Sequence, residues 1–223
     1  MLRRIILLCD EVERPFLTES LTAGAPDLSV VAAEMADLAA MDDATLAEAR
    51  LVAFCSPAIV PEAQLARLGH GACNFHPGPP TYPGWMPAAF AVYDGAREFG
   101  ATAHRMNRQV DDGEIIGVEM FPVAPGTSRA ELAKQAYLTL LRLFRQLAPT
   151  LARDPDLPPP LPIAWTPRKV TRALFAALCD IPLDIEAGEL RRRLAAFGDG
   201  DGLSVPTVWL HGVPFRHEKP SGD

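Results

Sequence analysis

The stretch Ala72-Cys-Asn-Phe-His-Pro-Gly-Pro-Pro-Thr-Tyr-Pro-Gly84 combines a short apolar run with a loop that contains four prolines. Residues 72–76 have the pattern of a buried strand, and a helix is expected after the loop, near residues 87–94. Asn74 and His76 project from the same face of that strand, because side chains alternate along it. They lie at its C-terminal end, where open α/β sheets bind ligands.

Pro77 forces His76 into an extended conformation, and the prolines that follow keep the loop rigid. A proton-transfer group beside an amide donor, both held rigidly, suits catalysis through a tetrahedral intermediate. The alternative is a core histidine whose neighbouring asparagine closes a turn. These two residues alone leave both interpretations open. Cys73 faces the other side of the strand and is expected in the core.

Apolar runs and helical patterns alternate on both sides of this stretch. Strands are expected at residues 5–9, 28–32, 51–55, 101–106 and 114–123. Helices are expected near residues 15–23, from the N-cap Asp42 to about residue 49, from Pro61, and from the Ser128–Glu131 capping box to about residue 147. This alternation predicts an α/β fold with a mostly parallel sheet and helices on both faces.

The composition changes after residue 148. Residues 149–167 hold seven of the 22 prolines and are expected to form a semi-rigid linker between a domain of residues 1–148 and an appendage of residues 168–223. The appendage is expected to contain helices near residues 170–178 and 186–197, then a hairpin over residues 204–217. This short α+β appendage is too small for an independent core, so we expect it to pack on the first domain.

Composition and missing motifs exclude several classes of protein. The chain has 223 residues, a net charge of -7, and no apolar run near the roughly 20 residues that span a bilayer. The apolar start is too short for a signal peptide, which indicates a cytoplasmic protein. The four cysteines form no C-x-x-C pair, so no metal site is expected. The acidic balance argues against nucleic acid as a partner, and there is no G-x-G-x-x-G, P-loop or G-x-S-x-G motif.

A second segment, Val110-Asp-Asp-Gly-Glu-Ile-Ile116, places carboxylates just before an expected strand. By itself it could be an acidic hairpin turn. Together with Asn74-Phe-His-Pro77 and Gly100-Ala-Thr-Ala-His104, it resembles the folate-dependent formyltransferase family, which includes methionyl-tRNA formyltransferase, glycinamide ribonucleotide transformylase and sugar N-formyltransferases. The match spans about 45 residues in the family's order, and weaker similarity covers the rest of the first 145 or so.

The resemblance implies a Rossmann-like formyltransferase fold and assigns roles to individual residues. It makes Asn74, His76 and Asp111 the catalytic residues, whereas Asp112 fills a variable position. The residues expected to bind the pterin of 10-formyltetrahydrofolate, the implied co-substrate, are Ile59, Val60, Met106, Asn107, Arg108 and Val110. Tyr82 and Trp85 lie where an acceptor could stack, although packing against the loop is the simpler interpretation. His104 has either a structural or a chemical role.

The expected reaction is transfer of a formyl group from 10-formyltetrahydrofolate to a small-molecule primary amine, with an amino-sugar nucleotide as the first candidate and a small metabolic amine as the second. A protonated His76 and the Asn74 amide are expected to stabilise the charge on the formyl oxygen. The alternatives are a 10-formyltetrahydrofolate hydrolase, a methionyl-tRNA formyltransferase-like enzyme and a non-catalytic binding protein. The sequence leaves the oligomeric state open, a homodimer included.

Two departures from the family pattern qualify this expectation. Gly78-Pro-Pro-Thr81 stands where many relatives have Ser-Leu-Leu-Pro, and Asp10-Glu-Val-Glu13 replaces the glycine-rich turn of phosphate-binding relatives. The short appendage and the negative charge argue against initiator tRNA as the acceptor.

Overall fold

A six-stranded sheet forms the centre of the computed structural model, which describes residues 1–200, 202 and 204–218. The strands are β1 (Arg4–Leu8), β2 (Ser29–Ala32), β3 (Ala49–Phe54), β4 (Ala72–His76), β5 (Glu98–Arg105) and β6 (Ile115–Pro122). They lie in the order β2-β1-β3-β4-β5-β6. The first four run parallel, and β5 runs antiparallel to both of its neighbours. The expected mostly parallel sheet is confirmed.

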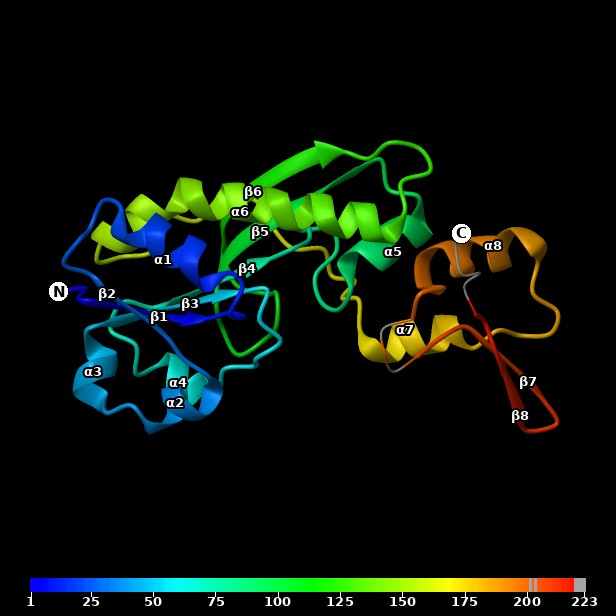
Figure 1. Cartoon of the computed structure of the whole chain (residues 1–223), viewed down its shortest axis with the longest axis horizontal. Helices are drawn as coiled ribbons and strands as arrows, with labels where there is room; N and C mark the ends of the chain where they lie inside the picture. The colour runs from blue at the N-terminus through cyan, green and yellow to red at the C-terminus, as the bar shows by residue number, and fades with distance from the viewer. Residues whose placement is uncertain (201, 203, 219–223) are drawn as a thin grey trace.

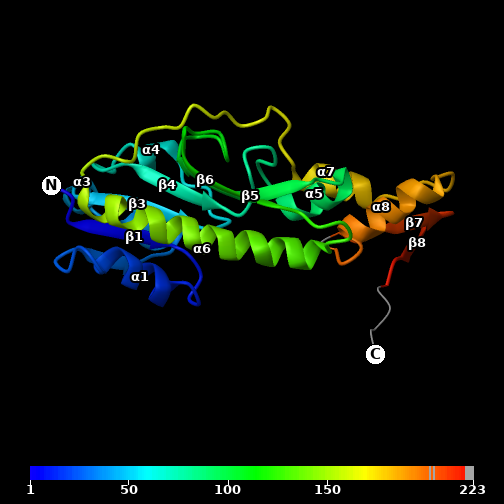
Figure 2. The same cartoon turned by 90° about the horizontal axis from the view of Figure 1, so that it is seen from above.

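Helices cover both faces of this sheet, as expected (Figures 1 and 2). On one face lie α1 (Arg14–Thr22) and α6 (Arg129–Arg153); on the other lie α2 (Met35–Ala40), α3 (Asp43–Ala47) and α4 (Glu62–Leu65). Successive side chains of β1 point to opposite faces of the sheet and so contribute to the hydrophobic core on each face. Ile5 and Leu7 pack towards α1 and α6, whereas Ile6 and Leu8 pack towards the helices of the other face. Every residue of β3 is buried, as is typical of a central parallel strand.

Helix α6 is longer than its sequence predicts. The Ser128–Glu131 capping box is present, but the helix continues through Pro149 to Arg153 instead of ending near residue 147. Residues 149–153 are therefore helical, and the irregular segment starts later than the expected linker. Leu151 is fully buried against the sheet, and its carbonyl accepts a hydrogen bond from the buried Arg50 guanidinium. This packing stabilises a last turn that a proline alone would interrupt.

The C-terminal part packs on α5 (Pro87–Asp94), as expected. It consists of α7 (Arg172–Cys179), α8 (Ala187–Phe197) and an antiparallel hairpin of β7 (Thr207–Leu210) and β8 (Val213–Arg216). Phe90 of α5 contacts Phe175 and Phe197 in a shared aromatic core. Figure 1 shows this part at the end of the molecule opposite the N-terminus. No helix in the described part of the chain has both the length and the hydropathy needed to cross a bilayer.

Candidate functional site

Strands β4 and β5 bring Asn74, His76 and His104 to one face of the sheet. The antiparallel register places Asn74 directly opposite His104 and His76 opposite Thr102. Side chains that are opposite each other on one face lie within contact distance, and the Asn74 amide nitrogen is 3.2 Å from His104 Nε2. The hydroxyl of Thr102 donates to the carbonyl of Gly78 at 2.7 Å, which fixes the loop after His76 to β5.

Asp111 joins this group from the loop before β6. Its buried carboxylate accepts a hydrogen bond from the Gly84 backbone N–H at 2.8 Å. The same carboxylate lies 3.3 Å from His76 Nδ1 and 3.2 Å from His104 Nε2. Asp111 has a φ of 46°, a left-handed conformation that aspartate tolerates better than most residues. The three side chains expected to be catalytic therefore converge, with His104 as a fourth member of the group.

The remaining ring nitrogens of both histidines face backbone carbonyls. His76 Nε2 is 3.1 Å from the Tyr82 carbonyl, and His104 Nδ1 is 2.9 Å from that of Arg105. A carbonyl oxygen only accepts, so these contacts place one proton on each of those nitrogens. A second proton on either ring would face Asp111.

Burial and charge decide the protonation of the buried pair. Burial lowers the pKa of His76, and this effect outweighs the attraction of Asp111, which raises it. Burial raises the pKa of Asp111, but His76, His104 and the Gly84 N–H lower it to about 2. Burial thus favours the neutral imidazole of His76, the Asp111 carboxylate beside it favours the charged imidazole expected from the sequence, and Asp111 itself is held in its ionised form.

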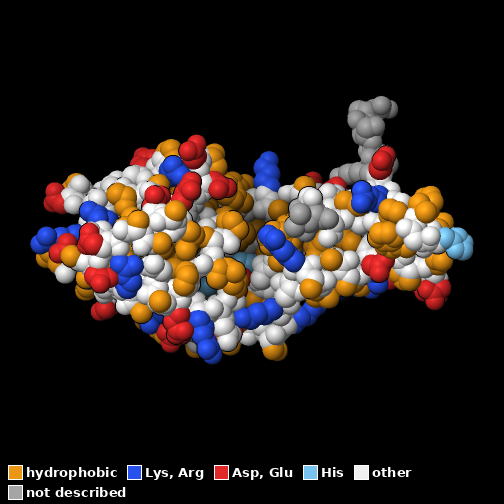
Figure 3. Space-filling model, turned by 90° about the horizontal axis from the view of Figure 1, so that it is seen from below, with side chains coloured by type: hydrophobic (Ala, Val, Ile, Leu, Met, Phe, Trp, Pro, Cys, Tyr) orange, Lys and Arg blue, Asp and Glu red, His pale blue; other side chains and the backbone are white. Residues whose placement is uncertain are grey.

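These side chains border a cleft of about 1130 Å³. Figure 3 shows pale blue histidine surface inside a hollow between the sheet and the C-terminal part, with Lys and Arg side chains around it. The lining includes the residues expected to be catalytic and those expected to bind the pterin, together with Trp85: Asn74, His76, Asp111, Ile59, Val60, Met106, Asn107, Arg108 and Val110. Tyr82 does not line the cleft, because its ring packs on Phe99 with centroids 5.9 Å apart. This packing agrees with the simpler of the two interpretations given for Tyr82 above.

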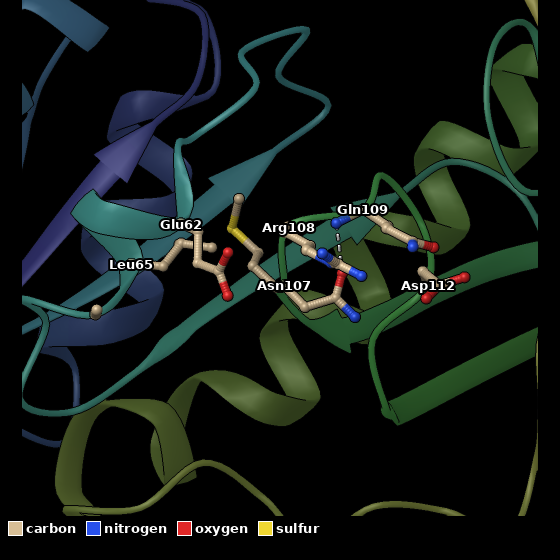
Figure 4. Close-up of a pocket in the computed structure, with 8 residues that line it drawn as sticks. Glu62, Leu65, Asn107, Arg108, Gln109 and Asp112 are labelled. Atoms are coloured by element: carbon tan, nitrogen blue, oxygen red, sulfur yellow. Dashed lines mark hydrogen bonds between the residues drawn. The ribbon is translucent and has the colours of Figure 1, made fainter.

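Residues 106–109 separate this cleft from a second hollow of about 540 Å³, since they border both. Figure 4 shows Glu62 and Leu65 of α4 on one side of that hollow, and Asp112 at its other end. The Asn107 side chain accepts a hydrogen bond from the Gln109 N–H at 2.8 Å and tightens the loop between them. The loop expected to contact the pterin is therefore locally ordered by its own sequence.

Several lining residues carry no signal in the sequence. Cys55, Arg129, Tyr137 and Arg172 reach the cleft from distant parts of the chain. The guanidinium of Arg172 stacks on Trp85 at 4.1 Å from the ring centre, so one face of that indole is already covered. Only the helix and strand pairings of the fold bring these residues together. Among the described residues, no three His, Cys, Asp or Glu side chains are arranged to hold a metal ion.

Comparison with known proteins places this site in a family. Residues 15–138, more than half of the chain, match the profile of the formyl transferase family. A methionyl-tRNA formyltransferase from Sorangium cellulosum strain So ce56 is 28% identical over 196 residues. That alignment covers 87% of this chain but 59% of the relative, so this chain spans less than two thirds of its length.

Solved structures share the fold over nearly the whole chain. A sugar N-formyltransferase from Shewanella sp FDAARGOS_354 matches with a TM-score of 0.76 and 18% identity, covering 97% of this chain and 96% of that one. An N-formyltransferase from Helicobacter canadensis, in complex with folinic acid and dTDP-3-aminofucose, matches with a TM-score of 0.66 and 12% identity, covering 96% and 86%. The family profile, matched from α1 into α6 and including the four-residue group, shows that the chain belongs to the formyl transferase family.

Proposed function

We propose that this protein transfers a formyl group from 10-formyltetrahydrofolate to a primary amine. The observation that carries the proposal is the convergence of Asn74 and His76, from β4, with Asp111, from the loop before β6, at one edge of a cleft in a chain of this family. A binding protein on the same fold would not need an ionised carboxylate held against two buried imidazoles, because burying such groups is unfavourable.

The shape of the cleft supports a folate as the donor. Its volume of about 1130 Å³ exceeds the roughly 300–1,000 Å³ of pockets for one small ligand, which leaves room for donor and acceptor together. We assign the pterin to the end lined by Ile59, Val60 and the 106–110 loop, where apolar side chains lie beside backbone groups. The printed description of the related Helicobacter canadensis enzyme includes folinic acid, which is consistent with this donor class.

The chain's own residues supply donors and a proton carrier for the reaction. The bond from the formyl carbon to the acceptor nitrogen forms, the bond to the folate nitrogen breaks, and one proton moves from the amine to that folate nitrogen. The Asn74 amide stabilises the charge that develops on the formyl oxygen, and one such donor contributes about 10²–10³ in rate; the His76 Nε2–H faces the Tyr82 carbonyl instead. In its neutral form His76 accepts the amine proton at Nδ1, the nitrogen that faces Asp111, and passes it to the folate nitrogen; ionised Asp111 stabilises the imidazolium formed in between.

For the acceptor we propose an amino-sugar nucleotide. Arg108, Arg129 and Arg172 line the cleft of a protein whose net charge is -7, and guanidinium groups bind phosphates well. The acidic Asp10–Glu13 turn argues against a phosphate at the end of β1, so we assign the phosphates to the arginines near α5 and α7. The Shewanella sugar N-formyltransferase has nearly the same extent as this chain, which supports the same choice.

The test supplies 10-formyltetrahydrofolate to the wild-type protein with one amine at a time: a dTDP-amino-sugar, small amines, methionyl-tRNA, or none. Folate release is followed by absorbance, and the formylated amine by mass spectrometry. His76→Asn should abolish transfer. His211→Asn is the matched control, because His211 lies at the exposed turn of the β7–β8 hairpin with a φ of 49°, which asparagine tolerates.

The outcomes separate the candidate functions. Formylation of the amino-sugar nucleotide by the wild type and by His211→Asn supports the proposal. Formylation of methionyl-tRNA alone corrects the acceptor, and folate release without an amine identifies a hydrolase. Folate binding without turnover under every condition refutes an enzymatic role.

A further inference from the structure

Trp165 contacts both buried histidines although it lies far from them in the sequence. Its ring meets that of His76 edge-on, with centroids 5.8 Å apart at 76°, and that of His104 at 5.1 Å and 89°. Its indole N–H donates to the carbonyl of Gly113 at 2.8 Å. Trp165 is not among the residues that line the cleft, so it reaches the histidines from outside the substrate space.

We propose that Trp165 is a positioning residue for the His76–Asp111–His104 group, and that the C-terminal segment thereby controls the geometry of the site. The kinetic part of this inference rests on the proposed function; the structural part does not. Residues 165–170, which we name the strap, carry Trp165 across the two loops that meet at Asp111.

On one side the strap is fixed to the proline-rich loop after His76. The Thr166 N–H donates to the Pro80 carbonyl at 3.0 Å, and its hydroxyl donates to the Thr81 carbonyl at 3.0 Å. Further along, the Val170 N–H donates to the Pro83 carbonyl at 2.9 Å. Prolines in both partners reduce the freedom that this docking removes, so the strap is well suited to hold one position.

On the other side the strap is fixed to the Asp111 loop. The Lys169 ammonium donates to the Val110 carbonyl at 2.9 Å and pairs with Asp112 at 3.1 Å. Gly113, which accepts from Trp165, packs so closely that a Cβ there would lie 1.8 Å from the Arg105 carbonyl oxygen. The strap therefore joins the two loops whose contact is the Gly84–Asp111 hydrogen bond.

The edge contact restricts how the imidazole rings can turn. His76 keeps Nδ1 towards Asp111 and Nε2 towards Tyr82 only while its ring plane is fixed, and Trp165 occupies the space beside it. Asp111 and His104 are the titratable groups that face His76, and the indole adds no charge of its own. Removing the indole therefore admits water and ring motion without changing any charge.

The experiment compares Trp165→Ala and Trp165→Phe with the wild-type chain. Phenylalanine keeps an aromatic ring beside the histidines, although it is smaller than the indole and lacks the hydrogen bond to Gly113, so it remains informative if alanine impairs folding. Ile163→Ala is the matched control, since Ile163 lies in the same proline-rich segment and is 44% exposed. Histidine titration is recorded by NMR on the protein without ligands, and kcat and KM are measured with 10-formyltetrahydrofolate and the acceptor from the amine panel.

In Trp165→Ala the His76 pKa should move up towards the ordinary value of about 6.5, because burial is what lowers it. The kcat should fall by about 10–100-fold, the effect of a small misplacement of reacting groups, while KM changes by less than about 3-fold. Trp165→Phe should retain the wild-type titration and most of the kcat. Unchanged titration and unchanged kcat in Trp165→Ala would overturn the inference. If no amine is formylated even by the wild type, the proposed function fails, and the titration still decides whether Trp165 positions the histidines.

Discussion

Replacing Asp111 by asparagine removes one buried charge and little else. Asparagine has nearly the same size, can accept the Gly84 hydrogen bond, and tolerates the φ of 46° at this position. The pKa of Asp111 falls from its ordinary value of 3.8 to about 2 in the folded protein. A pKa difference of one unit between the folded and unfolded states corresponds to about 1.4 kcal/mol, so the ionised carboxylate contributes about 2.5 kcal/mol to folding stability. We therefore expect Asp111→Asn to lower the free energy of unfolding by about 2–3 kcal/mol at pH 7.

The pH dependence has a defined sign. The folded state lowers the pKa of Asp111, so its contribution is complete above pH 3.8 and is lost as the pH falls towards 2. Urea unfolding of the wild type and Asp111→Asn from pH 7 to pH 2.5 measures this difference. The difference in the free energy of unfolding between the two proteins should become smaller below about pH 4. Asp112→Asn is the control: its side chain is 41% exposed, and its ion pair with Lys169 should contribute less than about 1 kcal/mol. Equal stability of the wild type and Asp111→Asn at pH 7 would refute the arrangement described for this carboxylate.

Other perturbations test neighbouring parts of the account. Burial lowers the pKa of His76, and the proposed mechanism uses the neutral imidazole to accept the amine proton. We therefore expect kcat to fall on the acid side of its pH profile with a midpoint below 6.5. A kcat that rises as the pH falls through this range would contradict a neutral His76. Gly78→Ser places a Cβ 2.6 Å from His76 Nε2 and should reduce kcat by about 10-fold or more; unchanged kcat would show that the ring can move freely. Arg50→Met removes the guanidinium that donates to the carbonyls of His70, Leu151 and Pro155, and it should destabilise the protein by about 3–5 kcal/mol in urea unfolding. A loss below about 1 kcal/mol would contradict a structural role for Arg50.

Local chemistry made much of the fold predictable. The bounds of β4 and α5 agree with the sequence analysis, because alternation marks the strand and a proline and a glycine bracket the helix. The Ser128 capping box and the Asp42 N-cap are both present, the latter accepting from the Thr45 N–H at 2.7 Å. These signals act over a few residues, so tertiary context does not override them.

Features that depend on packing were not predicted. Pro149 suggested an early end to α6, but the buried Leu151 and Ala152 continue the helix beyond it. Helix α2 was missed, since its capping box uses Glu34 and Asp37 in place of the usual serine or threonine. Contacts with the sheet thus extend α6 past its proline, and an uncommon cap starts α2 where the usual cap residues are absent.

The site likewise contains residues that short sequence motifs identify and residues that only the packing of the fold brings there. Asn74, His76 and Asp111 were identified from short motifs, and the structure brings them together at one end of the cleft. For Tyr82 the sequence left acceptor stacking and loop packing open, and in the structure its ring packs on Phe99. Trp165 has no motif, and only the return of the proline-rich segment across the sheet edge places it against the histidines.

Kinetics of the two adjacent carboxylates test the central claim most directly. With the acceptor that the amine panel identifies, kcat/KM is measured for the wild type, Asp111→Asn and Asp112→Asn under the same conditions. The account predicts a loss of at least about 100-fold for Asp111→Asn and less than about 3-fold for Asp112→Asn, since only Asp111 faces the imidazoles. Equal losses at both positions, or full transfer by Asp111→Asn, would contradict it.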